Sequence, residues 1–125
     1  MTTQNAQLVM IYNAPAGLPY AVRDSFWKTF APTSYPCALC ALAFGFFTMH
    51  REWREFLRRQ PHEVVDLHSD DYHEVFPDLE ERLPVILLRR EDGSREIIAS
   101  AAEMEAMTRL EQLVSLAERR LAEAG

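Results

Sequence analysis

A tight-turn dipeptide, Asp92-Gly93, lies between two short apolar segments near the end of the chain. The segment before it, residues 85–88, reads Val-Ile-Leu-Leu, and residues 96–98 after it read Glu-Ile-Ile. Aspartate and glycine tolerate the positive φ angles of the two-residue turns that join antiparallel strands. The sequence therefore predicts a β-hairpin here, and any fold proposed for the chain must contain it.

Two further strand-like segments come earlier: the apolar run at residues 8–12, which ends at turn residues, and residues 63–68, Glu-Val-Val-Asp-Leu-His. Between them, apolar positions recur at helical spacing at residues 18–30 and 51–59, and the continuous apolar run at residues 38–49 is typical of a buried helix. Strands separated by helices are typical of parallel crossovers. We therefore expect a single α/β domain over residues 1–125, with a four-stranded mixed sheet and helices on both faces.

Helix-start signals flank the predicted hairpin. Residues 69–71, Ser-Asp-Asp, are N-cap candidates for a short helix before it. After it, Ser100-x-x-Glu103 and Thr108-x-x-Glu111 both have the capping-box pattern, in which a hydroxyl and a carboxylate satisfy unpaired backbone N–H groups. The sequence thus predicts two helices after the hairpin, and the last of them closes the fold.

The charge balance excludes some classes of partner. Thirteen basic residues against nineteen acidic ones give a net charge of −6, whereas nucleic-acid binding depends mostly on neutralising phosphates. The longest apolar run, residues 38–49, is shorter than the roughly 20 residues needed to cross a bilayer. Residues 1–5 lack the cationic start of a signal peptide. We therefore expect no nucleic acid, no membrane and a cytoplasmic location.

Cys37 and Cys40 form the one motif with an evident chemistry, a Cys-x-x-Cys at the start of a predicted helix. Unpaired N–H groups and the helix dipole at that position favour the thiolate of Cys37. Cys40 lies one turn further on, where it can attack a mixed disulfide and release the product. Tyr35 and Pro36 restrict the preceding loop and supply an aromatic wall. Such an exchange site needs an accessible first sulfur and no dissociable cofactor.

The order of these parts resembles the thioredoxin fold, in which a Cys-x-x-Cys helix is followed by a strand, a helix, a cis-proline, a hairpin and a closing helix. The corresponding strand here is residues 63–68, and the corresponding proline follows Leu83 in Leu83-Pro84. The resemblance implies that Cys37 attacks, that Cys40 resolves, and that Leu83 and a cis Pro84 form a substrate platform. The implied partner is a protein or a low-molecular-weight thiol or disulfide, in an oligomeric state that the sequence does not specify.

Two features depart from the thioredoxin pattern. A helical insertion at residues 13–36 separates the first strand from the Cys-x-x-Cys helix, and it would act either as a specificity lid or as a cover over the thiols. Thioredoxins also carry a buried acid at the end of that strand as a proton relay. Here the strand ends without one, and Asp24 and Asp66 are the candidate substitutes.

Residues 35–42, Tyr-Pro-Cys-Ala-Leu-Cys-Ala-Leu, together with residues 51–56, also resemble a group of small uncharacterised bacterial proteins, some of them labelled GTPases. A phosphate-binding loop of the GTPase kind ends in Gly-Lys-Ser/Thr. The sole lysine, Lys28, follows a tryptophan. The sequence therefore excludes the GTPase function.

Two non-catalytic alternatives stay open. Cys37, Cys40, His68 and His73 formally make a Cys₂His₂ set that would hold a zinc ion. The other alternative is a thioredoxin-fold protein-interaction module in which the insertion covers the thiols. Elemental analysis tests the first of these, and the rate of thiol alkylation in the native protein tests the second.

Overall fold

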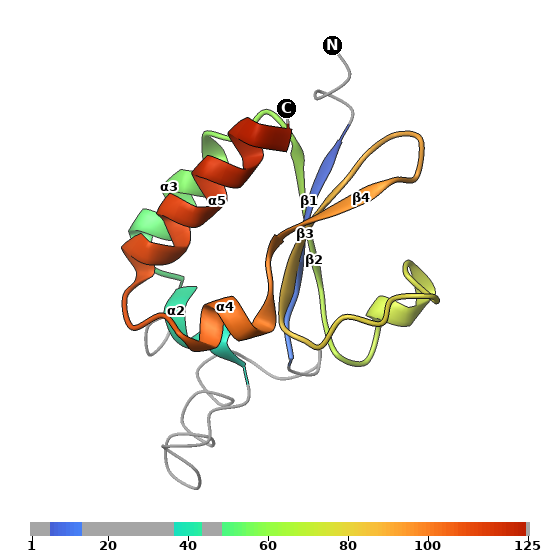
Figure 1. Ribbon diagram of the computed structural model, residues 1–125, viewed down its shortest axis with the longest axis horizontal. Coiled ribbons are helices and arrows are strands. Elements are labelled where there is room, and N and C mark those ends of the chain that lie inside the picture. The colour runs from blue at the N-terminus through green and yellow to red at the C-terminus, as the bar shows by residue number, and fades with distance from the viewer. Residues whose placement is uncertain (1–5, 14–36, 44–48, 125) are drawn as a thin grey trace, which may run out of the picture.

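The computed structural model describes residues 6–13, 37–43 and 49–124 (Figure 1). The elements in chain order are β1 (Gln7–Ile11), α2 (Ala38–Ala43), α3 (Arg51–Arg58), β2 (Glu63–Leu67), the single 3₁₀ turn η2 (Tyr72–Glu74), β3 (Val85–Arg89), β4 (Arg95–Ala99), α4 (Ala101–Glu105) and α5 (Leu110–Ala124). The helix expected at residues 18–30, and with it the predicted insertion before Cys37, lies outside the described residues.

The four strands form one mixed sheet in the order β2-β1-β3-β4. The central strand β1 runs parallel to β2, with Leu8 opposite Val64, and antiparallel to β3, with Leu8 opposite Leu88. β3 and β4 form the predicted antiparallel hairpin, and Gly93 in its turn has a φ of 90°, which a residue with a Cβ rarely adopts. The predicted mixed sheet is therefore confirmed, and its order is compatible with a thioredoxin-like layout.

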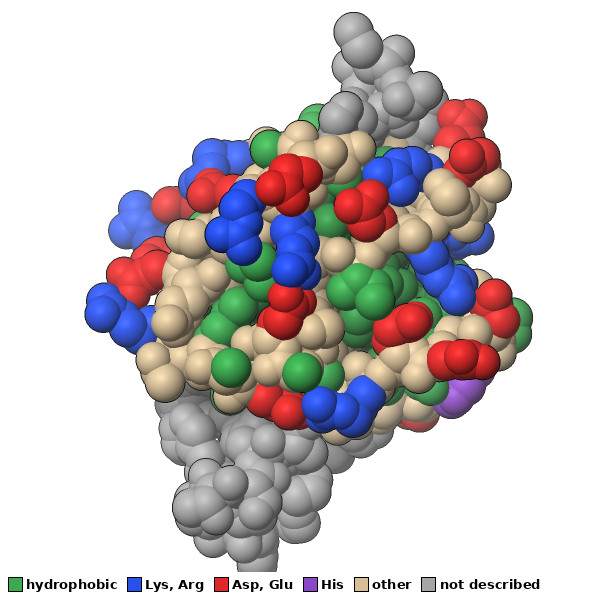
Figure 2. Space-filling view, in the orientation of Figure 1, with side chains coloured by type: hydrophobic (Ala, Val, Ile, Leu, Met, Phe, Trp, Pro, Cys, Tyr) green, Lys and Arg blue, Asp and Glu red, His purple; other side chains and the backbone are tan. Residues whose placement is uncertain are grey.

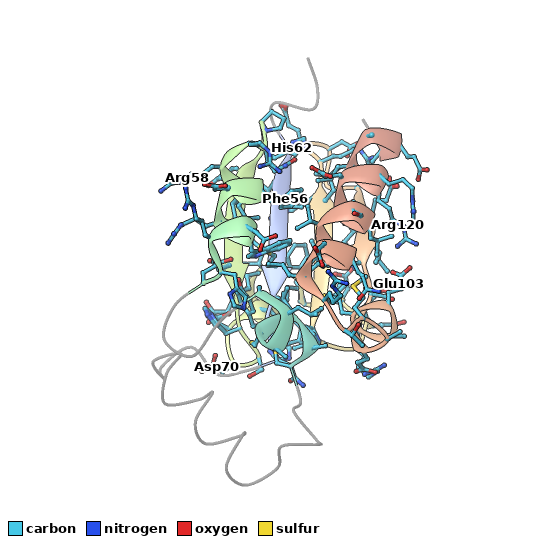
Figure 3. The ribbon with its side chains drawn as sticks, turned by 90° about the vertical axis from the view of Figure 1, so that its left-hand side faces the viewer. Phe56, Arg58, His62, Asp70, Glu103 and Arg120 are labelled. Carbon is cyan, nitrogen blue, oxygen red and sulfur yellow. The ribbon has the colours of Figure 1, made fainter. Side chains whose placement is uncertain are left out.

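One face of the sheet is covered by the α-helices that the structure describes (Figure 1). Because successive side chains of a strand point to opposite faces, Leu8, Met10 and Tyr12 all face these helices, and each is almost fully buried. Trp53 and Phe56 of α3 pack into the same cluster, and Phe56 points from the helix towards the sheet (Figure 3). This side holds the main hydrophobic core.

The opposite face is covered by the connection between β2 and β3. Phe76 of that connection packs with four buried strand residues, Val9, Ile11, Val85 and Leu87. The connection contains the one-turn η2 where the sequence predicts a short helix, and Pro77 disfavours helical geometry at the residue before it. In the described ranges the second face carries only a 3₁₀ turn, so helices on both faces are not confirmed, and the helix expected at residues 18–30 lies outside those ranges.

The apolar run at residues 38–49 does not reach Met49 as a helix. Residues 44–48 lie outside the described residues, α2 ends before them at Ala43, and Met49 takes part in an isolated β-bridge. The His50 N–H donates to the Ala43 carbonyl at 2.8 Å, so the chain returns to the end of α2 before α3 begins. The run is therefore not one continuous helix.

Of the two capping boxes predicted after the hairpin, the one at Ser100 is confirmed and the one at Thr108 is not. Ser100 Oγ accepts the Glu103 N–H at 3.2 Å, and the Glu103 carboxylate accepts the Ser100 N–H at 3.0 Å. At the start of α5, the side-chain oxygen of Gln112 accepts the N–H groups of Thr108 and Arg109. The predicted Thr108 box is therefore wrong by one residue, because a carboxamide and not the neighbouring glutamate satisfies the helix start.

The surface of the described residues mixes the two signs of charge. In Figure 2 acidic and basic side chains alternate over the visible face and do not gather by sign. Several of them form ion pairs, for example Arg90 with Glu96 at 2.8 Å. None of the helices in the described ranges is long and apolar enough to span a bilayer.

A bidentate ion pair between Glu103 and Arg120 joins α4 to α5. Arg120 donates to both carboxylate oxygens of Glu103, at 2.8 and 2.6 Å, and to the Ile98 carbonyl at 3.3 Å (Figure 3). The hydrogen bond from Arg120 is the main cause that lowers the pKa of Glu103 from 4.5 to about 2. Each side chain of the pair is about one-third exposed, so solvent screening reduces the stability gained.

We expect Glu103→Gln to lower the free energy of unfolding at neutral pH by about 1–2 kcal/mol. Because the folded pKa of Glu103 lies below its unfolded value, this stabilisation is complete above pH 4.5 and is lost as the pH falls towards 2. Urea titrations at several pH values should therefore show the variant and wild type converging in acid. Glu105→Gln, which breaks the more exposed pair with Arg82, is the matched control and should change stability little at any pH. A pH-independent difference for Glu103→Gln would contradict this account.

Candidate functional site

Several chain segments converge at one edge of the sheet. β1 and β2 are parallel and end there, at Ile11 and Leu67, so that Tyr12 and His68 follow directly, and the antiparallel β3 starts there. The Tyr12 N–H donates to the Leu67 carbonyl at 2.9 Å, which ties the two strand ends together. Leu83-Pro84 directly precedes β3, and its peptide bond is cis, as the resemblance implies. α2, which follows Cys37, lies at the same end of the molecule (Figure 1).

Cys37 occupies the N-cap position of α2. Its carbonyl accepts the Ala41 N–H at 3.0 Å, the first hydrogen bond of the helix, and its Sγ accepts the Cys40 N–H at 3.2 Å. A side chain that accepts the third helical N–H is the usual N-cap arrangement, and here a sulfur takes the place of a serine or aspartate oxygen. The helix start therefore directs a backbone donor at the first sulfur of the motif.

Both cysteines are buried. Cys37 is 2% exposed and Cys40 is 6% exposed, and neither is in a disulfide. They belong to the main core cluster together with Tyr12 and Leu39. The expectation of an accessible first sulfur is therefore wrong for this conformation, because the short α2 packs its cysteine-bearing side into the core.

A group of polar side chains follows the two parallel strands. The Tyr12 hydroxyl donates to Asp66 Oδ1 at 3.2 Å, and the rings of Tyr12 and His68 have their centroids 5.7 Å apart. His68 in turn contacts Asp71, whose Oδ1 accepts the His68 backbone N–H at 2.6 Å and whose Oδ2 lies 3.1 Å from His68 Nδ1. We call Tyr12, Asp66, His68 and Asp71 the strand-end cluster.

Asp66 lies on the edge strand β2. The residue is exposed, but nearby protein atoms remove part of the solvation of its carboxyl group, and this raises the pKa of Asp66. The hydrogen bond from the Tyr12 hydroxyl and the nearby His68 oppose that rise. Asp66 is thus a partly desolvated acid at the sheet edge, whereas Asp24, the other acid considered from the sequence, lies outside the described residues.

The four residues of the Cys₂His₂ alternative do not come together. Within residues 6–13, 37–43 and 49–124, no three His, Cys, Asp or Glu side chains are placed to share a metal ion. His68 is directed to Asp71, and the ring of His73 packs on Tyr72 with centroids 4.0 Å apart. The zinc-site hypothesis is therefore wrong for this arrangement.

The other predicted site residues fall into two groups. Leu83 and Pro84 are at the cysteine-bearing edge, and Pro84 is buried. Tyr35 and Pro36 lie outside the described residues. Sequence reasoning did not find Tyr12 or Asp71, although the alternation along residues 64, 66 and 68 already places Asp66 and His68 on one face.

We also compared the chain with known proteins. No family model, no curated protein and no solved structure matches the chain. The resemblance to thioredoxins consequently stands on the motif and on the layout of the sheet alone.

Proposed function

We propose that the protein carries out thiol–disulfide exchange through Cys37 and Cys40. The observation that carries the proposal is the hydrogen bond from the Cys40 N–H to Cys37 Sγ, 3.2 Å long, at the first turn of a helix. A donor directed at the sulfur stabilises the thiolate more than the thiol, since the charged acceptor forms the stronger bond. The two-residue spacing, the cis Leu83-Pro84 bond and the strand order support the same function.

The reaction follows from the two positions. The Cys37 thiolate attacks one sulfur of a disulfide, forms a mixed disulfide and expels the other sulfur as a thiolate, which takes up a proton. Cys40 then loses its proton and attacks Cys37 Sγ, so that the second substrate thiolate leaves. One substrate disulfide becomes two thiols while the protein gains the Cys37–Cys40 disulfide. A donor thiol returns the pair to its reduced form, and no dissociable cofactor takes part.

Burial of the sulfurs restricts how a substrate reaches them. With Cys37 at 2% exposure, a disulfide cannot touch its sulfur without local opening around α2. The exchange rate therefore depends on this opening as well as on the thiolate fraction. We expect small disulfides to react faster than folded proteins whose disulfides lie within their own interiors.

The test compares disulfide reduction by wild type, Cys37→Ser and Cys40→Ser in the presence of a donor thiol. Serine is a good N-cap residue, so Cys37→Ser keeps the cap and removes only the nucleophile. We expect Cys37→Ser to fall to the uncatalysed rate and Cys40→Ser to accumulate a mixed disulfide visible by mass spectrometry. A wild-type rate no higher than that of Cys37→Ser would exclude the function.

Burial of both cysteines favours a second candidate, a non-catalytic thioredoxin-fold domain that serves as a protein-interaction module. In that case the sulfurs act as small apolar core side chains. The two candidates differ in the alkylation of Cys37 under native conditions. Exchange requires modification well before global unfolding, whereas the silent domain would react only at the rate at which the whole fold opens.

A further inference from the structure

The turn of the β3–β4 hairpin contains the one aspartate of the sequence that is followed by glycine, in Asp92-Gly93. The loop projects from the end of the sheet (Figure 1), and both residues are exposed. A Cβ built at Gly93 would meet nothing within 4 Å. Solvent therefore reaches this peptide bond, and no side chain at position 93 shields its nitrogen.

An aspartate followed by glycine can isomerise without an enzyme. The glycine nitrogen attacks the side-chain carboxyl carbon of the aspartate, a water molecule leaves, and a five-membered succinimide ring forms. Water then opens the ring at either carbonyl, which restores aspartate or leaves isoaspartate, in which the main chain runs through the former side chain. Glycine favours the attack because it has no side chain and a wide choice of φ and ψ. No oxidant, reductant or cofactor takes part.

The side chain of Asp92 is already turned towards the backbone that follows it. Asp92 Oδ1 accepts the Ser94 N–H at 2.9 Å, so the carboxyl group lies beside the Gly93 peptide unit. Ring closure needs this orientation, because the carboxyl carbon must reach the nitrogen of the next residue. The native turn therefore holds the carboxyl group on the side of the chain where the ring forms.

Two hydrogen bonds oppose the reaction while the turn is closed. The Gly93 N–H donates to the Arg90 carbonyl at 2.9 Å, which occupies the attacking nitrogen. Hydrogen bonding to Ser94 lowers the pKa of Asp92, and an ionised carboxylate is attacked less readily than the protonated acid. Opening of the turn releases both groups together, and the end of a hairpin opens far more often than a whole fold.

We propose that Asp92 is a site of spontaneous isoaspartate formation in the folded protein, at a rate set by local opening of the hairpin turn. Isoaspartate adds one carbon to the main chain of the turn. The bond from the Gly93 N–H to Arg90, and the bond from the Arg90 N–H to the Ser94 carbonyl at 2.7 Å, both depend on the original length of the turn. The modification therefore loosens the end of the hairpin.

The experiment incubates folded and urea-unfolded protein at neutral pH and analyses peptides by electron-transfer mass spectrometry, which distinguishes isoaspartate from aspartate. We expect isoaspartate at Asp92 in both samples, and about tenfold or more slowly in the folded protein, because its turn is closed most of the time. Asp78 is the internal control. It is exposed and accepts a hydrogen bond from Arg95, but Leu79 follows it, so it should stay unmodified over the same period.

Asp92→Asn tests the geometry of the turn separately from the charge. The asparagine oxygen can still accept the Ser94 N–H, and the same backbone nitrogen attacks the amide carbon, with ammonia leaving in place of water. Because the amide carries no negative charge, we expect ring closure at least about tenfold faster than in the wild type. Asp78→Asn, which places an exposed asparagine before a leucine, is the matched control and should deamidate far more slowly.

Isoaspartate missing from the folded protein, over a time in which the unfolded protein converts, overturns the inference, because the reaction would then need global unfolding. Equal rates in the two samples overturn it as well, since the closed turn would then not control the reaction. In the modified protein the Arg90 and Gly93 amides should exchange hydrogen faster, and unchanged protection contradicts the loosened hairpin. These outcomes do not involve Cys37 or Cys40 and are independent of the proposed exchange function.

Discussion

Replacing Trp53 by alanine is expected to lower the free energy of unfolding by about 3–5 kcal/mol. Trp53 is fully buried in α3, and its ring stacks on Phe56 with centroids 5.1 Å apart. Both side chains fill the space between α3 and the sheet, where the main core cluster lies. Truncation to a methyl group leaves a cavity that the helix and sheet cannot close completely. Urea denaturation followed by circular dichroism measures the loss.

Trp53→Phe tests the effect of the polar indole N–H on stability separately from the effect of the ring volume. The indole N–H of Trp53 has no hydrogen-bond partner within the described ranges, and a buried unsatisfied donor costs about 1–3 kcal/mol. Trp53→Phe removes that donor and keeps most of the ring, so the two effects oppose each other. We expect a net change of about 1 kcal/mol or less. A loss as large as that of Trp53→Ala would mean that the N–H contributes to stability.

The strands of the sheet and its hairpin turn could be predicted from the sequence, because each of these features depends on residues that are close together in the chain. The segments expected as strands at residues 8–12 and 63–68 became β1 and β2, and Asp92-Gly93 became the hairpin turn. The parallel direction of β1 and β2 followed from the helices between them, since such a crossover lets the second strand start at the same end of the sheet as the first. These features depend on backbone preference and on alternation, and both can be read from one chain.

The features that sequence missed depend on contacts between distant residues. The 3₁₀ turn at Tyr72–Glu74 replaced a helix because Phe76 is anchored on the sheet and Pro77 follows it at once. The end of α2 at Ala43 lies inside a run whose composition is uniformly apolar. Propensity alone does not predict that His50 bonds back to Ala43, a contact between residues that one continuous helix would hold apart.

The candidate site also has one part that the sequence predicted and another that it did not. The two cysteines could be placed at a helix start from their spacing, and the N-cap bond to Cys37 Sγ follows from that position. Their burial could not be predicted, because it depends on how α2 packs against the remainder of the core. The strand-end cluster was missed because Tyr12 and Asp66 are 54 positions apart and meet only through the parallel pairing of β1 and β2.

Phe76→Ala is expected to destabilise the fold by about 3–5 kcal/mol, although the residue lies in a connection. Phe76 is 3% exposed and fills the smaller core on the second face of the sheet. The guanidinium groups of Arg89 and Arg95 lie 5.3 and 5.5 Å from its ring centroid. Loss of the ring removes both the apolar contact and these cation–π contacts, so thermal and urea unfolding should both report a marked decrease.

Phe76→Leu is the control, because it keeps an apolar side chain at this buried position and removes only the aromatic ring. It should lose only the cation–π contribution and some packing, about 1–2 kcal/mol.

The two variants should also differ in how easily the connection between β2 and β3 opens locally. Because no α-helix of the described residues covers this face, Phe76 is the main anchor of the connection, which also carries Asp71 and leads to the cis Leu83-Pro84 bond.

We therefore expect Phe76→Ala to raise hydrogen exchange and limited proteolysis between β2 and β3 before the helical face is affected. Since Asp71 is within the released segment, the same variant should weaken its hold on His68. Uniform loss of protection over both faces would instead mean that the two hydrophobic clusters unfold as one unit. In that case the second face contributes to global stability and has no local opening of its own.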